Sequence, residues 1–342
     1  MAKRPTRDDV AKLAGVSAAT VSYVINDGPR PVSEETRARV LDAIEQLGYR
    51  PHAIARSLKT GRTRTVGLLI PTLLSPGFAY LINEVEDCLA SHDYALVLAS
   101  SHEDGERESR VLDAMLSQSI AGLLYTPSTP RLRDQVTQLI GDGVPVVFVD
   151  RHIPGVPADT VMTDNVKAGR QATEHLVQQG CRHIVCVSFS HEASAAMDRV
   201  EGYRQALRQH DLPVDEKMIL VIPDPAGEMG MSALHEYSDT FGLPDGIMCN
   251  NQTHTIGVVK ALRERGVRVP DQVAVVGGFF VSPWDTLLEP SLPLVNQDMR
   301  RMARKAVEFL MKRLGGDDSP PRMMLLDPEL ILVSGAESVA EA

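Results

Sequence analysis

The stretch TRDDVAKLAGVSAATVSYVIN, residues 6–26, decides the fold of the N-terminal part of this chain. Thr6 is a good N-cap for a first helix, because two carboxylates in the next turn favour the positive end of the helix dipole. Gly15 relaxes the backbone for a turn, and Ser17 can cap a second helix. The pattern predicts two short helices joined by a tight turn, which is typical of a helix-turn-helix.

Apolar spacing predicts how these two helices pack against each other. The buried faces are expected to hold Val10, Ala11 and Leu13 in the first helix and Val21, Val24 and Ile25 in the second. The outer face of the second helix carries short or hydrogen-bonding side chains, namely Ala18, Ala19, Ser22, Tyr23 and Asn26. A helix with its apolar face packed against a neighbouring helix and an outer face of this kind is suited to be a recognition helix in a groove of duplex DNA. Any small helical hairpin can contain such a turn, so this interpretation also depends on neighbouring basic residues.

Charge is distributed unevenly along the chain. The 342 residues carry a net charge of −10, which by itself argues against a nucleic-acid partner. Residues 1–64, however, hold 12 Lys and Arg against 7 Asp and Glu, whereas the remainder holds 23 against 38. The N-terminal part therefore carries +5 and the rest −15, so the basic charge lies where phosphate contacts are needed.

A third helix and a segment with two interpretations follow. Ser33 caps the helix, Gly48 ends it, and its inner stripe is expected to be Val40, Leu41, Ile44 and Leu47. After Pro51 the chain has few apolar residues and continues into a basic tether, which is compatible with a plain linker. Alternatively, residues 52–58 form a helix only on DNA, with Leu58 as a wedge between base steps in the minor groove. Phosphate contacts would then come from Arg56, Lys59, Arg62 and Arg64.

Beyond the basic tether, short apolar runs alternate with longer amphipathic segments. The runs that read as buried strands are VGLLI, ALVLAS, AGLLYT and VVFVD in the first half and HIVCVS, MILVI, GIMCN and VAVVG in the second. Apolar strands separated by helices predict parallel sheets covered by helices on both faces. We expect two doubly wound subdomains, of residues 65–161 plus 294–320 and of residues 162–293 plus 321–335.

Ligands of such sheets bind beyond the carboxyl ends of the strands. These ends are expected at 71–75, 100–102, 126–128, 150–151, 188–190, 250–252 and 277–280. A cleft between the two subdomains is therefore the predicted ligand site.

Several classes of protein are disfavoured by what the sequence lacks. No apolar run reaches the ~18–20 residues that span a bilayer, and the start MAKRPTRDD has no signal-peptide pattern. No nucleophile elbow, Walker loop or HExxH motif is present, and the four scattered cysteines favour reduced thiols over a zinc site. The low aromatic content, 4%, argues against an aromatic sugar-binding cleft. We expect a cytoplasmic protein that is no enzyme, needs no cofactor or metal, and has no membrane partner.

The sequence resembles the LacI/GalR family of bacterial transcription regulators over nearly its whole length. The N-terminal match rests on DVAKLAGVSAATVSYVIN and VSEETRARVLDAIEQLGYRPHAIARSLKTGRTRTVGLLIP. Further matches are VPVVFVDR, HLVQQGCRHIVCVS, DRVEGYRQAL, LRERGVRVPDQVAVVG and PELIL. The resemblance implies an all-α helix-turn-helix headpiece in residues 1–50, a hinge in 51–64, and an α/β core in 65–342. This core is similar to periplasmic binding proteins, with two doubly wound parallel-sheet subdomains.

The resemblance also implies a homodimer on a palindromic duplex DNA operator, with recognition helices in the major groove and hinge helices in the minor groove. The positions that match base or phosphate contacts are Thr6, Ser17, Ala18, Ala19, Thr20, Ser22, Tyr23, Asn26, Ser33, Thr36 and Tyr49. His52, Ala55 and Leu58 match the family's hinge. Many members have Arg where Tyr23 stands, and Tyr lacks the bidentate grip of Arg on guanine. We therefore expect a different base at that position of the operator half-site.

A small-molecule effector cleft is implied as well, and here the sequence departs from the family. The positions expected to contact the effector are Ser75, Phe78, Asp150, Arg199, Asn251, Gln252 and Phe280. Gln252 stands where the family usually has Asp, and Gly277-Gly278-Phe279-Phe280 replaces Gly-Phe-Asp-Asp. The cleft therefore loses carboxylates, which accept strong hydrogen bonds from a diol, whereas an amide accepts on one side only.

Two effector positions have structural alternatives. Arg199 could anchor a sugar hydroxyl or a carboxylate, or it could form a salt bridge to Asp198 or Glu201 on its own helix. Asp150 could contact the ligand or pair with Arg151 at the end of its strand.

The sequence thus predicts a sequence-specific transcriptional regulator, most simply a repressor, whose operator affinity responds to a sugar or a sugar-like metabolite. Such a bacterial protein would associate with the nucleoid when bound to its operator. The alternative is a member that has lost small-molecule sensing and answers a co-repressor or a protein partner. No heptad-patterned helix follows PELILV, so a dimer is expected rather than a tetramer.

Overall fold

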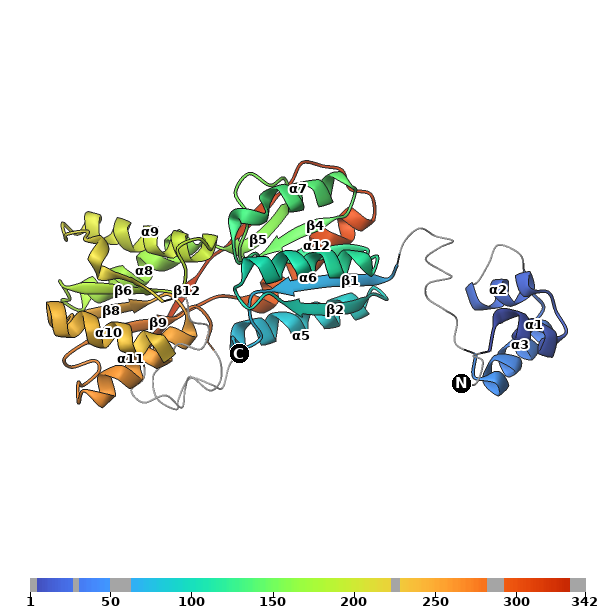
Figure 1. Ribbon diagram of the computed structural model, residues 1–342, viewed down its shortest axis with the longest axis horizontal. Helices are drawn as coiled ribbons and strands as arrows, with labels where there is room; N and C mark the ends of the chain where they lie inside the picture. The colour runs from blue at the N-terminus through green and yellow to red at the C-terminus, as the bar shows by residue number, and fades with distance from the viewer. Residues whose placement is uncertain (1–4, 27–30, 50–62, 223–227, 282–291, 333–342) are drawn as a thin grey trace. The chain divides into compact units, whose positions relative to one another are not determined.

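The computed structural model describes residues 5–26, 31–49, 63–222, 228–281 and 292–332. These residues form two compact units, one ending at Thr63 and one beginning at Arg64, which we call the headpiece and the core (Figure 1). The predicted hinge helix, with His52, Ala55 and Leu58, lies outside the described residues.

The headpiece contains the three expected helices, α1 (Arg7–Ala14), α2 (Ala18–Asn26) and α3 (Glu34–Leu47). Thr6 and Asp9 form a reciprocal capping box at the start of α1. Thr6 Oγ1 accepts from Asp9 N at 3.3 Å, and Asp9 Oδ2 accepts from Thr6 N at 2.8 Å. Gly15 ends α1 with a φ of 65°, a conformation that disfavours a Cβ. The predicted helix-turn-helix is confirmed.

The buried stripe of the headpiece is narrower than the sequence pattern indicates. Val10 and Val40 are fully buried, but Leu13 and Leu41 are 50% and 51% exposed, so the prediction that they are buried is wrong. Successive residues of a helix are rotated by roughly 100°, so the buried residues Val10, Ala11 and Ala14 form one stripe and Leu13 lies well to one side of it. A small three-helix unit buries only that central stripe.

The core contains two sheets, each of six described strands. The N-terminal subdomain has the order β11-β5-β4-β3-β1-β2, with all neighbours parallel. Its strands are β1 (Thr65–Ile70), β2 (Ala95–Ser100), β3 (Gly122–Tyr125), β4 (Val146–Val149), β5 (Asp159–Thr163) and β11 (Met323–Leu326). Helices α5 (Pro76–Ala90) and α12 (Met299–Leu314) cover one face, and α6 (Gly105–Ser117) and α7 (Arg133–Gly141) cover the other. Between β3 and α7 lies the short 3-10 helix η1 (Pro130–Leu132).

The C-terminal subdomain repeats this architecture with the order β12-β10-β9-β8-β6-β7. Its strands are β6 (Ile184–Ser188), β7 (Ile219–Val221), β8 (Gly246–Cys249), β9 (Ala274–Gly278), β10 (Pro293–Asn296) and β12 (Glu329–Leu332). Helices α8 (Asn165–Gln178) and α9 (Ser194–Gln209) cover one face, and α10 (Glu228–Phe241) and α11 (Gln252–Glu264) cover the other. The strand β12 runs antiparallel to β10, while the other neighbours are parallel.

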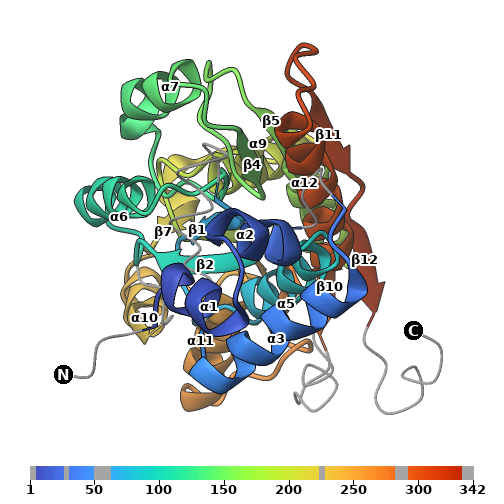
Figure 2. The same ribbon diagram turned by 90° about the vertical axis from the view of Figure 1, so that its right-hand side faces the viewer.

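The chain passes between the two subdomains after β5, after β10 and after β11 (Figure 1). Figure 2 shows α6 and α7 on one side of the strands of the N-terminal sheet and α12 on the other. The strand β10 extends the C-terminal sheet, and β11 extends the N-terminal sheet. Both placements differ from the expected division at 294–320 and 321–335. Each of these strands is four residues long, so its apolar pattern does not specify which sheet it joins.

All four cysteines are free thiols, and Cys181, Cys186 and Cys249 are buried. Within the described ranges, no cluster of His, Cys, Asp and Glu could hold a metal ion. No helix in the described part of the chain is both long enough and apolar enough to span a bilayer.

Candidate functional site

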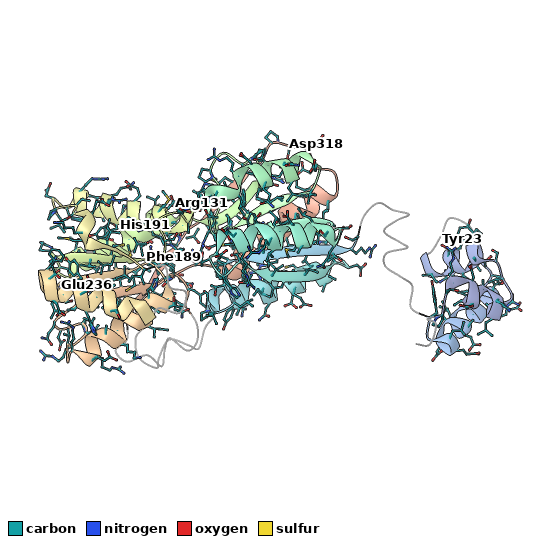
Figure 3. The ribbon with its side chains drawn as sticks, viewed as in Figure 1. Tyr23, Arg131, Phe189, His191, Glu236 and Asp318 are labelled. Atoms are coloured by element: carbon teal, nitrogen blue, oxygen red, sulfur yellow. The ribbon has the colours of Figure 1, made fainter. Side chains whose placement is uncertain are left out.

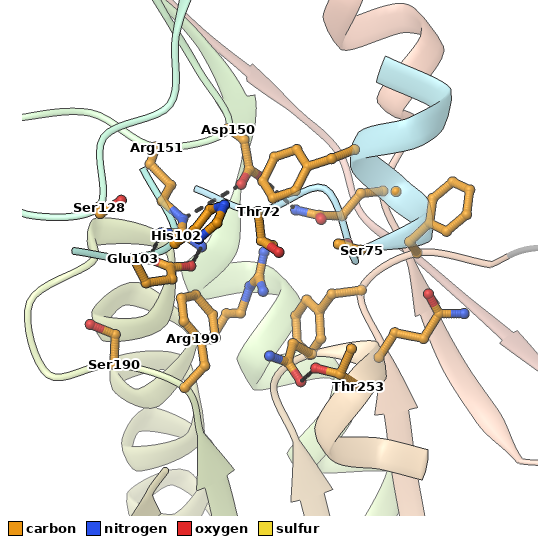
Figure 4. Close-up of a pocket in the computed structure, with 18 of the residues that line it drawn as sticks. Thr72, Ser75, His102, Glu103, Ser128, Asp150, Arg151, Ser190, Arg199 and Thr253 are labelled. Atoms are coloured by element: carbon orange, nitrogen blue, oxygen red, sulfur yellow. Dashed lines mark hydrogen bonds and ion pairs between the residues drawn. The ribbon is translucent and has the colours of Figure 1, made fainter. Parts of the chain in front are cut away.

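A cavity of about 460 Å³ lies in the core at the carboxyl ends of strands from both sheets (Figure 4). The N-terminal subdomain contributes residues that follow β1 to β4, and the C-terminal subdomain contributes residues that follow β6, β8, β9 and β10. All seven residues predicted for the effector cleft line this cavity: Ser75, Phe78, Asp150, Arg199, Asn251, Gln252 and Phe280. Their contact with an effector stays a prediction.

Arg199 projects from α9 into the cavity, where three neutral acceptors hold its guanidinium (Figure 4). Its Nε donates to Asn165 Oδ1 at 2.8 Å, and its Nη1 donates to Asn250 O at 2.7 Å. With the Gln297 carboxamide oriented to satisfy its hydrogen bonds, Arg199 Nη2 donates to Gln297 Oε1 at 2.9 Å. The guanidinium carbon also lies 4.1 Å from the centre of the Phe279 ring.

The charge of Arg199 is buried and has no carboxylate in direct contact. Glu201 pairs with Arg204 and Arg208 instead, and no ion pair to Arg199 forms among the described residues. Arg199 is 3% exposed, and burial lowers its pKa to about 10, an effect that the charge of Asp150 partly opposes. Because a guanidinium has five N–H donors, these three hydrogen bonds to described residues leave two N–H groups over.

Two glycines bring Arg199 to this position. Helices α8 and α9 cross so closely that a Cβ on Gly169 would lie 2.0 Å from Arg199 O. A Cβ on Gly202 would lie 2.1 Å from Val166 O. The close crossing places Asn165, the first residue of α8, within hydrogen-bond distance of the Arg199 side chain.

Arg151 is neutralised within the protein. Its Nη1 and Nη2 donate to the two carboxylate oxygens of Glu103, each at 2.9 Å, in a bidentate pair. The Phe189 ring lies 4.7 Å from the guanidinium carbon of Arg151. Arg151 Nε is 3.8 Å from Asp150 Oδ2, so the predicted Asp150–Arg151 pair exists but is long. Asp150 therefore keeps acceptor capacity towards the cavity.

Aromatic rings form much of the apolar lining. Four of the seven phenylalanines in the chain line the cavity: Phe78, Phe189, Phe279 and Phe280. Tyr80 packs behind Phe280, with ring centres 5.0 Å apart. The low overall aromatic content therefore does not exclude an aromatic cleft, because the few rings are concentrated here.

The loop after β8 opens α11 at the edge of the cavity. Asn251 Oδ1 accepts from His254 N at 2.8 Å and so caps α11 through its amide oxygen. Gln252 follows as the first residue of the helix and is 9% exposed. On the opposite wall, Ser75 occupies the N-cap of α5 without a side-chain capping hydrogen bond, so the helix does not use its hydroxyl.

In the headpiece, several of the residues predicted to contact DNA also cap the N-termini of helices. Ser17 Oγ accepts from Thr20 N at 3.1 Å, and Ser33 Oγ accepts from Thr36 N at 3.3 Å. On α2, Ala19 is exposed and Ala18, Ser22 and Tyr23 are half-buried. Figure 3 labels Tyr23 on this helix. Tyr49 is half-buried after α3, and the side chain of Asn26 lies outside the described residues.

Comparison with known proteins identifies the family. A family described as bacterial regulatory proteins, lacI family, matches residues 6–52, and a periplasmic binding protein-like domain matches residues 173–332. The chain is 32% identical over 329 residues to the HTH-type transcriptional repressor PurR of Actinobacillus pleuropneumoniae serotype 3, covering 96% of this chain and 97% of that protein. The chain belongs to the LacI family.

Further relatives and solved structures extend the comparison. The HTH-type transcriptional regulator RegA of Clostridium saccharobutylicum is 32% identical, with 94% of this chain and 96% of that protein covered. The solved complex of the transcriptional regulator CelR with cellobiose is 31% identical, with a TM-score of 0.70 and 96% and 98% of the two chains covered. The lac repressor dimer bound to operator shares the fold, with a TM-score of 0.84 at 23% identity over 96% and 98% of the two chains. As a LacI-family member, the chain is a DNA-binding transcriptional regulator and not an enzyme.

The cavity of this LacI-family core also contains residues that the sequence analysis did not single out. Phe189 lies within the predicted strand end 188–190, and Glu103 lies one residue beyond another, so the strand-end signal points to both. Gln297 follows β10, a strand that the apolar pattern did not predict. Thr129 and Glu192 lie in loops, and no sequence signal connects them.

Proposed function

We propose that the cleft binds a small, uncharged ring molecule carrying several hydroxyl groups, and that this effector controls the affinity of a homodimeric repressor for its operator. The observation that carries the proposal is Arg199, a buried cation with two N–H groups left for a ligand. Asp150 lies on the opposite wall (Figure 4) and can accept hydrogen bonds, because its ion pair with Arg151 is long.

The charges that line the cavity favour an uncharged ligand. Arg151 is paired with Glu103, and Arg131 is paired with Glu192. Asp104, which also lines the cavity, is exposed and caps α6, so the buried charges that remain are those of Arg199 and Asp150, with opposite signs. A ligand with a net charge would leave one charge uncompensated in a largely buried site, which is costly.

The remaining groups match the chemistry of a sugar. A hydroxyl can donate to Asp150 while a neighbouring hydroxyl accepts from Arg199. The rings of Phe78, Phe189 and Phe280 can pack against the C–H face of the ligand. The CelR relative binds cellobiose, and a related regulator from Alkaliphilus metalliredigens was solved with D-xylulofuranose, which supports this ligand class.

Exposed apolar residues of the core support a homodimer. Leu73 and Leu74 after β1 are 54% and 68% exposed, and Leu98 on the edge strand β2 is 38% exposed. Ile256 on α11 is 51% exposed. We assign these residues to the dimer interface, because burying them against a second copy removes apolar surface from water. Leu98→Asp should then produce monomers in sedimentation equilibrium, and an unchanged dimer would contradict this assignment.

In this proposal α2 of each protomer enters a major groove of a palindromic operator, and residues 51–64 link this contact to the core. Effector binding rotates the two core subdomains and changes how the paired hinge segments meet the minor groove. A coupling free energy of about 1–3 kcal/mol changes operator affinity roughly 5- to 150-fold. The protein would act in the bacterial cytoplasm and be associated with the nucleoid while operator-bound.

A ligand panel tests the proposal. Thermal unfolding is measured with monosaccharides, cellobiose, sugar acids and nucleobases, because a ligand at 100 times its Kd adds about 2.7 kcal/mol. DNA footprinting of the protein on the region upstream of its own gene is then carried out with and without the ligand that stabilises it. Uncharged sugars should stabilise the protein and change the footprint. Stabilisation by none of the panel would favour the alternative, in which a protein partner or co-repressor controls the regulator.

A further inference from the structure

The two subdomains are joined across the cavity by contacts centred on Glu192. Thr129 Oγ1 donates to Glu192 Oε2 at 2.8 Å, and Arg131 Nη2 donates to Glu192 Oε1. Thr129 and Arg131 follow β3 in the N-terminal subdomain, whereas Glu192 lies between β6 and α9 in the C-terminal subdomain. All three residues line the cavity. Figure 3 labels Arg131 in the N-terminal subdomain and His191, the neighbour of Glu192, in the C-terminal subdomain.

Each half of this contact is held in place by its own turn. Ser190 Oγ accepts from the backbone N–H groups of Glu192 and Ala193, each at 3.0 Å. On the other side, Thr129 caps η1 and accepts from Arg131 N at 3.3 Å. Because both halves are ordered locally, the contact depends mainly on the separation of the two subdomains.

We propose that Glu192 is a latch that holds the effector cleft closed by bridging to Thr129 and Arg131. Arg131 and Glu192 are 77% and 40% exposed at their side chains, so water and salt weaken the pair. A weak, exposed contact suits a latch that opens at each exchange of ligand. The hydrogen bonds from Arg131 and then Thr129 lower the pKa of Glu192, so it stays ionised near neutral pH.

Other contacts across the cleft are more buried. His152 N donates to Ser194 Oγ at 3.0 Å, and the Phe189 ring stacks on Arg151. Ser194 and Arg151 are 8% and 4% exposed, so these contacts keep the subdomains aligned, whereas the Glu192 bridge is open to solvent. Opening therefore begins at the Glu192 bridge.

The latch adds a regulatory property to the proposed effector site and rests on that proposal. A ligand that binds the closed cleft binds more weakly when the closed state is less populated, in proportion to its population. Weakening the latch therefore raises the apparent Kd of the effector without altering any group that contacts it.

The test measures cleft opening without an effector, so it is independent of the identity of the ligand. Spin labels are placed on exposed positions of α7 and α9 (Thr137→Cys and Gln209→Cys) in full-length protein with Cys88→Ser, diluted into unlabelled protomers. Pulsed dipolar spectroscopy then gives the distribution of distances between the two subdomains. Glu192→Gln should shift the closed-to-open ratio about two- to fivefold towards open, and Thr129→Val should shift it less.

Glu216→Gln is the matched control, because Glu216 forms a bidentate pair with Arg204 inside the C-terminal subdomain. It should leave the distances unchanged. The exchanged pair Arg131→Glu with Glu192→Arg should restore the closed distances that each single change loses. Wild-type distances in Glu192→Gln, or equal shifts in Glu192→Gln and Glu216→Gln, would overturn the latch. Failure of every sugar in the ligand panel would instead count against the effector proposal alone.

Discussion

Replacing Arg199 with methionine tests whether the buried guanidinium serves the ligand or the fold. Burial lowers its pKa from 12.5 to about 10, which corresponds to a cost of about 3 kcal/mol for keeping the charge. Against this stand three hydrogen bonds, to Asn165, Asn250 and Gln297, each worth about 1.5–3 kcal/mol for a charged donor. Their acceptors can be partly rehydrated from the cavity, and methionine retains much of the packing. The net of these terms is about 1.5–6 kcal/mol, and because water can replace part of each lost hydrogen bond we expect the free energy of unfolding without ligand to fall by about 2 kcal/mol, near the lower end.

The ligand response should change much more. Losing hydrogen bonds from a charged donor worth about 1.5–3 kcal/mol raises the Kd roughly 10- to 150-fold. At a concentration 100 times the wild-type Kd, the stabilisation by ligand should fall from about 2.7 kcal/mol to between about 0.3 and 1.4 kcal/mol.

The assay is urea unfolding with and without the sugar that the panel identifies. Arg204→Met is the matched control, because Arg204 lies on the same helix but pairs with Glu216 outside the cavity. It should retain the full ligand increment. Full stabilisation of Arg199→Met by ligand would refute a ligand-binding role for Arg199. If the Arg199→Met variant does not fold without ligand, the hydrogen bonds of Arg199 contribute more to stability than the balance of burial cost and hydrogen-bond energies allows.

Three further changes test other parts of the molecule. Asp159→Asn should cost about 2–4 kcal/mol in urea unfolding at pH 7, because the fully buried Asp159 carboxylate pairs with Arg313 and Arg322. Those pairs lower the pKa of Asp159 in the folded protein from 3.8 to about 2. The carboxylate therefore contributes about 2 kcal/mol to the free energy of unfolding above pH ~4, and this contribution is lost as the pH falls towards 2. A difference in unfolding free energy between wild type and variant that does not shrink between pH 5 and 3 would contradict this. Tyr23→Arg should change base preference at one symmetric position of each operator half-site, and an unchanged binding-site selection profile would count against that contact. Gly202→Ala should destabilise the core by about 3 kcal/mol or more by forcing α8 and α9 apart, whereas Gly141→Ala, whose Cβ meets no atom within 4 Å, should be neutral or slightly stabilising. Equal unfolding free energies for these two glycine variants would remove the close-crossing argument.

The sequence alone determines the features that depend on neighbouring residues. Thr6, Ser17 and Ser33 cap the N-termini of helices as predicted, and Gly15 and Gly48 end helices with positive φ. The apolar runs predict most strands of both sheets, and the strand ends predict where the cavity lies. These signals are reliable because capping, turn geometry and strand burial are set within a few residues of the chain.

Tertiary structure decides everything that depends on how distant segments meet. The exposure of Leu13 follows from how narrow a stripe three short helices bury, and the sheet that β10 joins follows from the crossing of the chain between subdomains. Likewise, no local pattern connects Glu192 with Arg131, because their contact exists only when the subdomains approach across the cavity. A side chain's preference is encoded locally, but its partner depends on the closed fold. The sequence therefore specifies a DNA-binding regulator with an α/β core, and the structure specifies the contacts that join the two subdomains across the cavity.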